Sequence, residues 1–150
     1  MPQSLARNYI HLVFSTKHRI DLLPHTFLTE MHAYLAGILQ SCDCQAVSIG
    51  GTTNHVHLLF ALSKNRTLAE VIRTLKANSS RWINQHGYAN GHFAWQDGYG
   101  AFSISQSHVH AVHNYIRHQE EHHREVTFQD ELRRLCRLYG MEIDERYVWE

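Results

Sequence analysis

The chain has 150 residues and a mass of 17.5 kDa, enough for one domain with its own hydrophobic core. Apolar residues make up 43% and charged residues 19%, a globular balance that excludes a disordered or fibrous chain. No apolar run approaches the roughly 20 residues that cross a bilayer, and the N-terminus lacks a signal-peptide pattern. We therefore expect a cytoplasmic protein with no membrane partner, and the three cysteines are too few to indicate a disulfide framework.

Charge is distributed unevenly although the formal net charge is zero. Residues 1–90 carry eight Lys and Arg against four acids, whereas residues 91–150 carry six against ten. Only the first part could therefore offer an electropositive surface to a polyanion. Histidine is unusually frequent, with 14 occurrences.

The first half of the chain has strand and helix signals in alternation. Residues 9–16 (YIHLVFST) are aromatic and β-branched, which predicts a strand, and Pro24 opens a predicted helix that runs to about residue 39. Residues 46–50 (AVSIG) and 55–62 (HVHLLFAL) predict two further strands. The turn residues 51–54 (GTTN) between them indicate a hairpin.

The second half opens with a helix predicted over residues 68–86. Thr67 is placed to cap it, and Glu70 completes a capping box. Residues 98–103 (GYGAFS) predict the last strand.

Two more helices are expected beyond that strand. Ser107 is expected to cap a helix that runs to about residue 123, and residues 128–139 predict another, which ends at Gly140. The order strand, helix, strand, strand, helix, strand is that of an α+β, ferredoxin-like split βαβ fold with an antiparallel sheet. We expect one domain over 1–150, with the ferredoxin-like core at about 9–105 and a helical segment at about 107–139.

A pair of histidines lies in the third predicted strand. Side chains two apart on a strand share a face, so His55 and His57 project together while Val56 faces the opposite side. Two adjacent imidazoles make half of a divalent-metal site. The alternative is two histidines on a solvated face, and the pair alone does not decide between them.

Tyr115 and Gln119 are four residues apart on the helix predicted after Ser107, so their side chains share one helix face. A tyrosine hydroxyl is a capable nucleophile when a metal or a cation assists it. A glutamine carbonyl can be a third metal ligand beside two imidazoles. The alternative is an exposed tyrosine and a solvated glutamine.

Taken together, these motifs resemble a known family. His55 and His57 within NHVHLLF, Tyr115 within HNYIRHQEEHH, and Gln119 one turn later resemble the HUH-type single-tyrosine transposases of the insertion-sequence 200/605 family. FSTKHR around Lys17, residues 93–105 (FAWQDGYGAFSIS) and the ending EIDERYVW are also similar, so the resemblance covers nearly the whole chain.

The chain departs from the family pattern at Asn54, where the family usually carries Asp before the first motif histidine. Asn can hydrogen-bond to an imidazole but brings no charge, so we expect metal binding to persist with lower affinity.

The resemblance implies a DNA transposase that cleaves and rejoins single-stranded DNA at element ends through a 5′-phosphotyrosine intermediate. Tyr115 would be the nucleophile, and His55, His57 and Gln119 would hold Mg²⁺ or Mn²⁺. The family also implies a DNA hairpin as ligand and a homodimer whose active sites are completed in trans. Two alternatives stay open: a domesticated relative that processes repeat palindromes, and a catalytically idle descendant that only binds DNA hairpins.

Basic residues in the first part of the chain are candidate DNA contacts. They could track a phosphate backbone, and the alternative for the helix is a solvated face. The candidates are Lys17, Arg19, Arg66, Arg73, Lys76 and Arg81. Four aromatic residues could stack on unpaired bases, although a core role fits most of them better: Trp82, Trp95, Tyr99 and Phe102.

Overall fold

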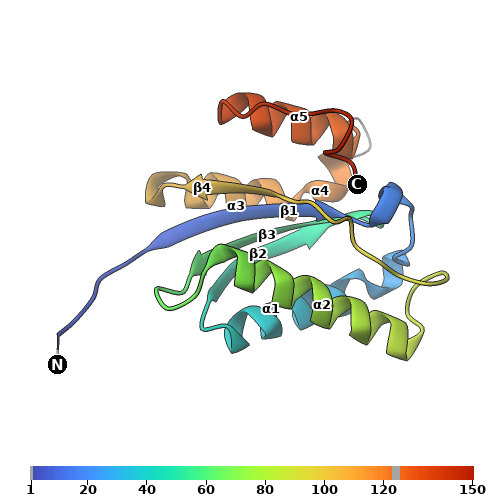
Figure 1. Ribbon diagram of the computed structural model, residues 1–150, viewed down its shortest axis with the longest axis horizontal. Helices are drawn as coiled ribbons and strands as arrows, with labels where there is room; N and C mark the ends of the chain where they lie inside the picture. The colour runs from blue at the N-terminus through green and yellow to red at the C-terminus, as the bar shows by residue number, and fades with distance from the viewer. Residues whose placement is uncertain (1, 123–125) are drawn as a thin grey trace.

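The fold is a four-stranded antiparallel sheet with helices on both faces, as a computed structural model of the chain shows (Figure 1). The structure describes residues 2–122 and 126–150, and for Glu120 the backbone alone. The strands are β1 (Asn8–Ser15), β2 (Gln45–Gly51), β3 (His55–Leu62) and β4 (Gly100–Ile104), in the spatial order β2-β3-β1-β4. Every neighbouring pair is antiparallel, which confirms the predicted ferredoxin-like arrangement.

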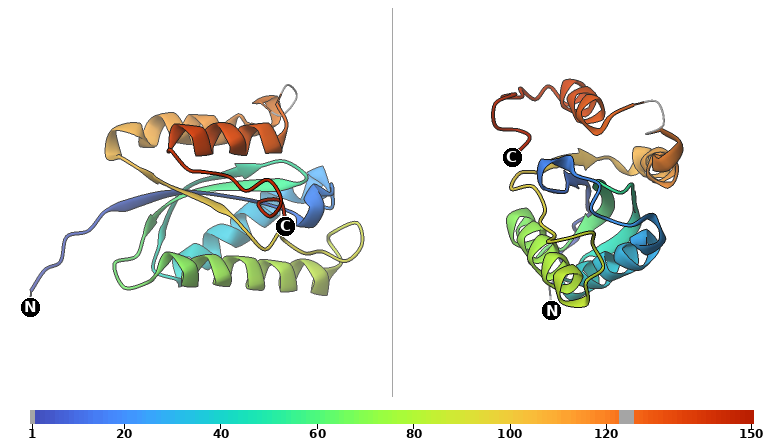
Figure 2. Two further views of the ribbon diagram at one scale, coloured as in Figure 1. Left: turned by 45° about the horizontal axis from the view of Figure 1, so that its top comes forward. Right: turned by 90° about the vertical axis from the view of Figure 1, so that its right-hand side faces the viewer.

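The helices form two layers (Figures 1 and 2). One layer consists of α1 (Leu28–Ser41) and α2 (Leu68–His86), and the other of α3 (Val109–Arg117), α4 (Gln119–His122) and α5 (Phe128–Leu138). None of these helices, among the described residues, has the length and apolar character that crossing a bilayer requires.

The two faces of the sheet differ in chemistry because successive strand residues point to opposite sides. The face toward α1 and α2 is apolar in its centre, with Ile10, Leu12, Phe14, Val56, Leu58 and Phe60 in the main core. The opposite face carries both apolar and polar side chains. There Val13 pairs with His57 and Ser15 with His55, which places the histidine pair in the middle of the molecule under the second helical layer.

Local signals in the sequence account for the best-predicted elements. The bounds of β3 and α2 are those expected, and the Thr67–Glu70 capping box is present with both of its hydrogen bonds. Gly87 ends α2 in the left-handed conformation, at φ +64°.

The prediction of one continuous helix from Ser107 to about residue 123 is wrong, because a 3-10 turn and two separate helices, α3 and α4, occupy this segment. A 3-10 turn (Gln106–His108) precedes α3, and the Ser107 hydroxyl lies 3.2 Å from the His108 ring instead of capping the helix. The chain leaves helical geometry at His118, whose Nδ1 lies 2.7 Å from the backbone carbonyl oxygen of Asn114. A side chain that hydrogen-bonds to that carbonyl oxygen competes with the backbone N–H hydrogen bond that would continue the helix. His123 lies outside the described residues.

The C-terminal part holds α5 against the sheet. Phe128, Leu132 and Cys136 pack with Val13 and Phe102 in a second core cluster. After α5 the chain returns across it, where a salt bridge of 2.8 Å joins Arg133 to Glu145. The last carbonyl, that of Glu150, accepts hydrogen bonds from the backbone of Asp97 and Gly98. The C-terminus is therefore part of the folded unit.

The contact between β2 and α3 requires glycine at position 50. A Cβ there would lie 2.5 Å from the backbone oxygen of Ile116, so Gly50→Ala should push α3 away from the sheet. We expect it to lower the free energy of unfolding by about 1–3 kcal/mol, measured by urea denaturation. Gly37→Ala is the matched control: an added Cβ at this position inside α1 would meet no atom of another element within 4 Å, so the change should raise stability by about 0.5–1 kcal/mol. Equal effects of the two changes would contradict this account.

Candidate active site

The histidine pair opens β3 and is completely buried. His55 is the first residue after the β2–β3 turn and His57 follows on the same face, each with 0% exposure. Burial at this level rules out the solvated-face alternative. Two buried imidazoles need polar partners on both ring nitrogens, and the neighbouring elements provide them.

The Nδ1 atoms of the two rings contact different elements of the fold. His55 Nδ1 lies 2.8 Å from Asn54 Oδ1 and 2.9 Å from Thr52 Oγ1, both in the turn. His57 Nδ1 lies 2.8 Å from Nε2 of His11 on β1. Asn54 therefore supplies the hydrogen-bonding oxygen at the position where the family usually has Asp, although without its charge.

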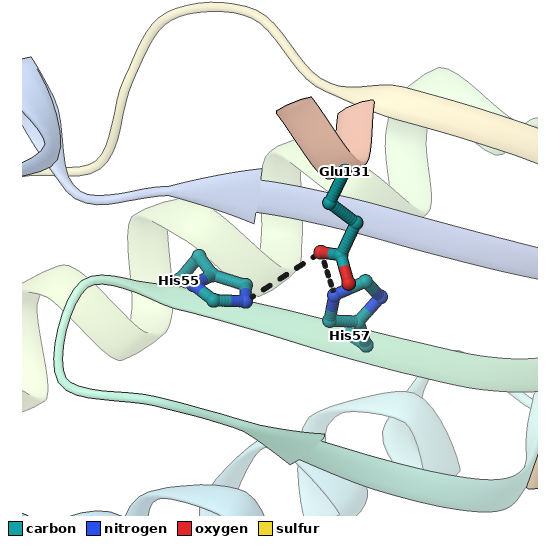
Figure 3. A group of neighbouring side chains, drawn as sticks. All are labelled: His55, His57 and Glu131. Carbon is teal, nitrogen blue, oxygen red and sulfur yellow. Dashed lines mark hydrogen bonds and ion pairs between the residues drawn. The ribbon is translucent and has the colours of Figure 1, made fainter. Parts of the chain in front are cut away.

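A carboxylate from α5 lies beside the Nε2 atoms of both histidine rings (Figure 3). Glu131 is only 2% exposed, and its Oε1 lies 2.8 Å from His57 Nε2 and 3.7 Å from His55 Nε2. The three ligand-type atoms lie within 4.8 Å of one another, a separation compatible with one metal ion. Glu131 is not among the site residues predicted from the sequence. The sequence feature that could have indicated Glu131 is the presence of an acidic residue on the apolar face of an amphipathic helix, between Phe128 and Leu132.

Tyr115 and Gln119 converge on the same carboxylate. Gln119 Oε1 lies 3.2 Å from His55 Nε2, and its amide donates to Glu131 Oε2 at 3.4 Å. The Tyr115 hydroxyl donates to the same oxygen. His122 Nε2 lies 3.4 Å from it. The helix break at His118 lies between the two predicted residues, yet both face the histidine pair.

Burial and the carboxylate set the protonation of this centre. Desolvation, reinforced by the negative charge of Glu131, raises the pKa of the Tyr115 phenol well above its usual range. Desolvation lowers the pKa of His11 to about 3, with a further contribution from His57, so His11 is neutral. In this arrangement the tyrosine is a protonated phenol that donates to a buried carboxylate.

The donor set fits a divalent cation. Asn54 Oδ1 lies beside Nδ1 of His55, and the tautomer that donates to it from Nδ1 directs an Nε2 lone pair toward the carbonyl oxygen of Gln119 and the carboxylate of Glu131. Converging lone pairs in a buried site require a proton or a cation between them. Both Mg²⁺ and Mn²⁺ accept the carboxylate and amide oxygens as ligands. The two imidazole nitrogens suit Mn²⁺ better than Mg²⁺, which prefers a coordination shell made of oxygen atoms.

Comparison with known proteins decides the family. The family model described as "Transposase IS200 like" matches residues 4–119. The chain belongs to the IS200-like transposase family. The match ends at Gln119, so α5 and Glu131 lie outside it.

Solved structures show the same fold as this transposase. A candidate transposase from Deinococcus radiodurans R1 is 20% identical with a TM-score of 0.59, over 79% of this chain and 98% of that one. A REP-associated tyrosine transposase bound to a REP hairpin is 12% identical with a TM-score of 0.59, over 84% of this chain and 74% of that one. No curated protein matches the sequence.

The predicted DNA contacts are distributed over both sides of the transposase. Lys17 follows β1, whose last residue Ser15 pairs with His55, so it lies at the site's end of the sheet. Arg19 donates to the carbonyl of Trp149 at 3.0 Å and lies over its ring. The exposed arginines of the α2 region are Arg66, Arg73 and Arg81. Because α2 covers the sheet face opposite the histidine pair, a DNA strand that contacted both the α2 arginines and the histidine pair would pass around the edge of the sheet (Figure 1).

Lys76 has a structural role in the fold. Its ammonium donates to the backbone carbonyls of Gln96, Asp97 and Gly98 at 2.8, 3.2 and 2.6 Å. Burial lowers the pKa of Lys76 to about 8. Three carbonyls occupy its three donors, which leaves none for a phosphate.

The aromatic candidates fall mostly in the core, as the core interpretation predicted. Trp95 and Phe102 are buried, and Trp82 stacks on Tyr34 with ring centroids 4.0 Å apart. Tyr99 is 46% exposed.

Lys76 and Arg73 should therefore respond differently to substitution. Lys76→Met leaves three carbonyls without a donor, so we expect a loss of about 2 kcal/mol in the free energy of unfolding. Arg73→Ala should change stability by no more than about 0.5 kcal/mol and reduce the salt dependence of DNA binding. Urea denaturation and salt titrations of DNA affinity measure both. A stable Lys76→Met variant with selectively weakened DNA binding would return Lys76 to the DNA contacts.

Proposed function

We propose that this transposase cleaves and rejoins single-stranded DNA through a covalent bond between Tyr115 and a 5′-phosphate. One observation carries the proposal: a nucleophile-type hydroxyl, the histidine pair and Gln119 converge on one buried carboxylate from separate elements of the fold. Family membership supplies the reaction class. The buried, mutually bonded arrangement argues against a catalytically idle descendant, which needs none of these contacts to bind a hairpin.

The residues proposed to hold a metal are His55, His57 and Glu131, with the Gln119 carbonyl as the ligand that the resemblance implied. The proposed ion is Mg²⁺ or Mn²⁺. When bound, such an ion polarises a non-bridging phosphate oxygen and stabilises charge on the leaving 3′ oxygen.

Tyr115 performs the exchange at phosphorus. Its hydroxyl oxygen forms a bond to phosphorus while the bond from phosphorus to the 3′ oxygen breaks, which yields a 5′-phosphotyrosine and a 3′ oxygen that takes a proton from solvent to become the free 3′-hydroxyl. Glu131 Oε2 already accepts the phenol hydrogen bond and is placed to take the proton as Tyr115 attacks. The covalent link conserves the energy of the phosphodiester, so rejoining needs no ATP.

The proposed site is complete within one chain. The resemblance implied that the tyrosine helix of one subunit meets the histidine pair of another. Here α3 packs on its own sheet, and the Tyr115 ring centroid lies 5.8 Å from that of His57. We therefore propose that each chain cleaves with its own tyrosine; a homodimer stays a prediction.

We propose single-stranded DNA next to a hairpin as the ligand. The structural neighbour bound to a REP hairpin supports this class of DNA, and it also favours repeat-palindrome processing as the second candidate function. An open groove of about 510 Å³ reaches Tyr115, lined by Asn114, His118 and His122. The metal-facing atoms are buried, so entry of a phosphate requires a shift of α5 that keeps Glu131 within reach of Tyr115 and the histidine pair.

Tyr115→Phe tests the proposed nucleophile. The variant keeps the ring but has no oxygen to attack phosphorus, so we expect no protein–DNA adduct and DNA affinity within about threefold of wild type. The measurement is a denaturing gel of labelled single-stranded hairpin DNA with Mg²⁺ or Mn²⁺, with and without chelator.

Tyr139→Phe, a tyrosine 42% exposed at the end of α5, is the matched control and should keep the adduct. An adduct that persists in Tyr115→Phe would remove Tyr115 as the nucleophile. An adduct insensitive to chelator would remove the metal from the proposal.

A further inference from the structure

A third buried histidine adjoins the histidine pair. His11 lies in the centre of β1, in an otherwise apolar run, and is 2% exposed. Its strand neighbours are Leu59 on β3 and Phe102 on β4, so its side chain shares the sheet face of His57. A buried imidazole in this position costs desolvation energy that an apolar residue would not, which calls for a compensating role.

The contacts of His11 point to one partner. Its Nε2 lies 2.8 Å from His57 Nδ1, with the two ring centroids 5.0 Å apart. The ring is also tilted against Phe102 and T-shaped with Tyr115, with centroids 6.2 and 6.3 Å away. These aromatic contacts fix the plane of His11 and therefore the direction of its hydrogen bond to His57.

We propose that His11 is a positioning residue that fixes the ring of His57 with Nε2 directed at the proposed metal position. This inference rests on the proposed metal site. It follows from the ring's chemistry: a nitrogen–nitrogen hydrogen bond at Nδ1 sets both the ring orientation and the atom left free on the inward side.

An imidazole suits this position because its nitrogen can either donate or accept. When Glu131 Oε1 accepts a hydrogen from His57 Nε2, the His57 Nδ1 lone pair needs a donor, and His11 Nε2–H provides it. When His57 Nε2 carries a lone pair toward a cation, His57 Nδ1–H needs an acceptor, and His11 Nε2 provides that. A backbone carbonyl could serve only the second state.

The two motif histidines are thus held in matching ways from different sides. Asn54 Oδ1 and Thr52 Oγ1 meet His55 Nδ1 from the turn, whereas His11 meets His57 Nδ1 from the next strand. Both rings consequently direct Nε2 toward Glu131. A merely space-filling role for His11 would be met equally well by phenylalanine.

The hydrogen bond itself can be tested without a substitution. In ¹⁵N-labelled wild-type protein free of metal, we expect a scalar coupling across the bond between His11 Nε2 and His57 Nδ1. Absence of that coupling, with both rings assigned, would overturn the proposal.

The consequence for metal binding is tested with Mn²⁺ by calorimetry. His11→Phe keeps a planar ring without nitrogen, and we expect the Mn²⁺ dissociation constant to rise about 10–100-fold. His11→Gln, whose amide can donate or accept at a similar reach, should return to within about threefold of wild type. His32→Phe, at a histidine on α1, is the matched control and should bind Mn²⁺ as wild type does. Thermal midpoints in chelator identify any variant that fails to fold.

Two failures can be told apart. If His57→Ala binds Mn²⁺ as tightly as wild type, the proposed metal site is wrong and the role of His11 falls with it. If His57→Ala loses Mn²⁺ but a folded His11→Phe does not, the metal site stands and His11 is only a packing residue. Loss in both His11→Phe and His11→Gln, with both folded, would also contradict positioning through a hydrogen bond.

Discussion

The arrangement of the site depends on one buried carboxylate. Glu131 is 2% exposed, and a charge at that depth is stable only when opposite charge or hydrogen-bond donors surround it. Its two oxygens meet the histidine pair on one side and Tyr115, Gln119 and His122 on the other. These partners come from β3, α3 and α4, so the carboxylate links the second helical layer to the sheet. Removing it would leave an uncompensated cluster of imidazoles and a phenol in the interior.

That dependence gives the C-terminal part of the chain two roles. The matched family region ends at residue 119, and α5 follows it. Phe128 and Leu132 bury apolar surface against the sheet, while Glu131 between them enters the centre. The returning chain holds α5 through Arg133 and Glu145. The same contacts that stabilise the fold therefore assemble the proposed metal ligands and also bury them, which ties access of DNA to the position of α5.

Sequence reasoning predicted what short-range patterns determine. The strand period alone put His55 and His57 on one face, and the turn and capping signals defined β3 and α2. It failed where side chains compete with the backbone, as at His118. It also missed Glu131 and His11, because their significance arises only when α5 crosses the sheet and β1 pairs with β3. A polar residue in the apolar run of a strand, or on the apolar stripe of a helix, was the available signal in both cases.

One chain is proposed to contain a complete cleavage centre, and a mixing experiment tests this most directly. His57→Ala and Tyr115→Phe are each expected to be inactive, and both are to be verified as folded. With every site built in a single chain, an equimolar mixture of the two should form no covalent adduct with single-stranded hairpin DNA in Mn²⁺. An adduct in the mixture would show that an intact histidine pair on one chain works with the tyrosine of another, and would contradict the account.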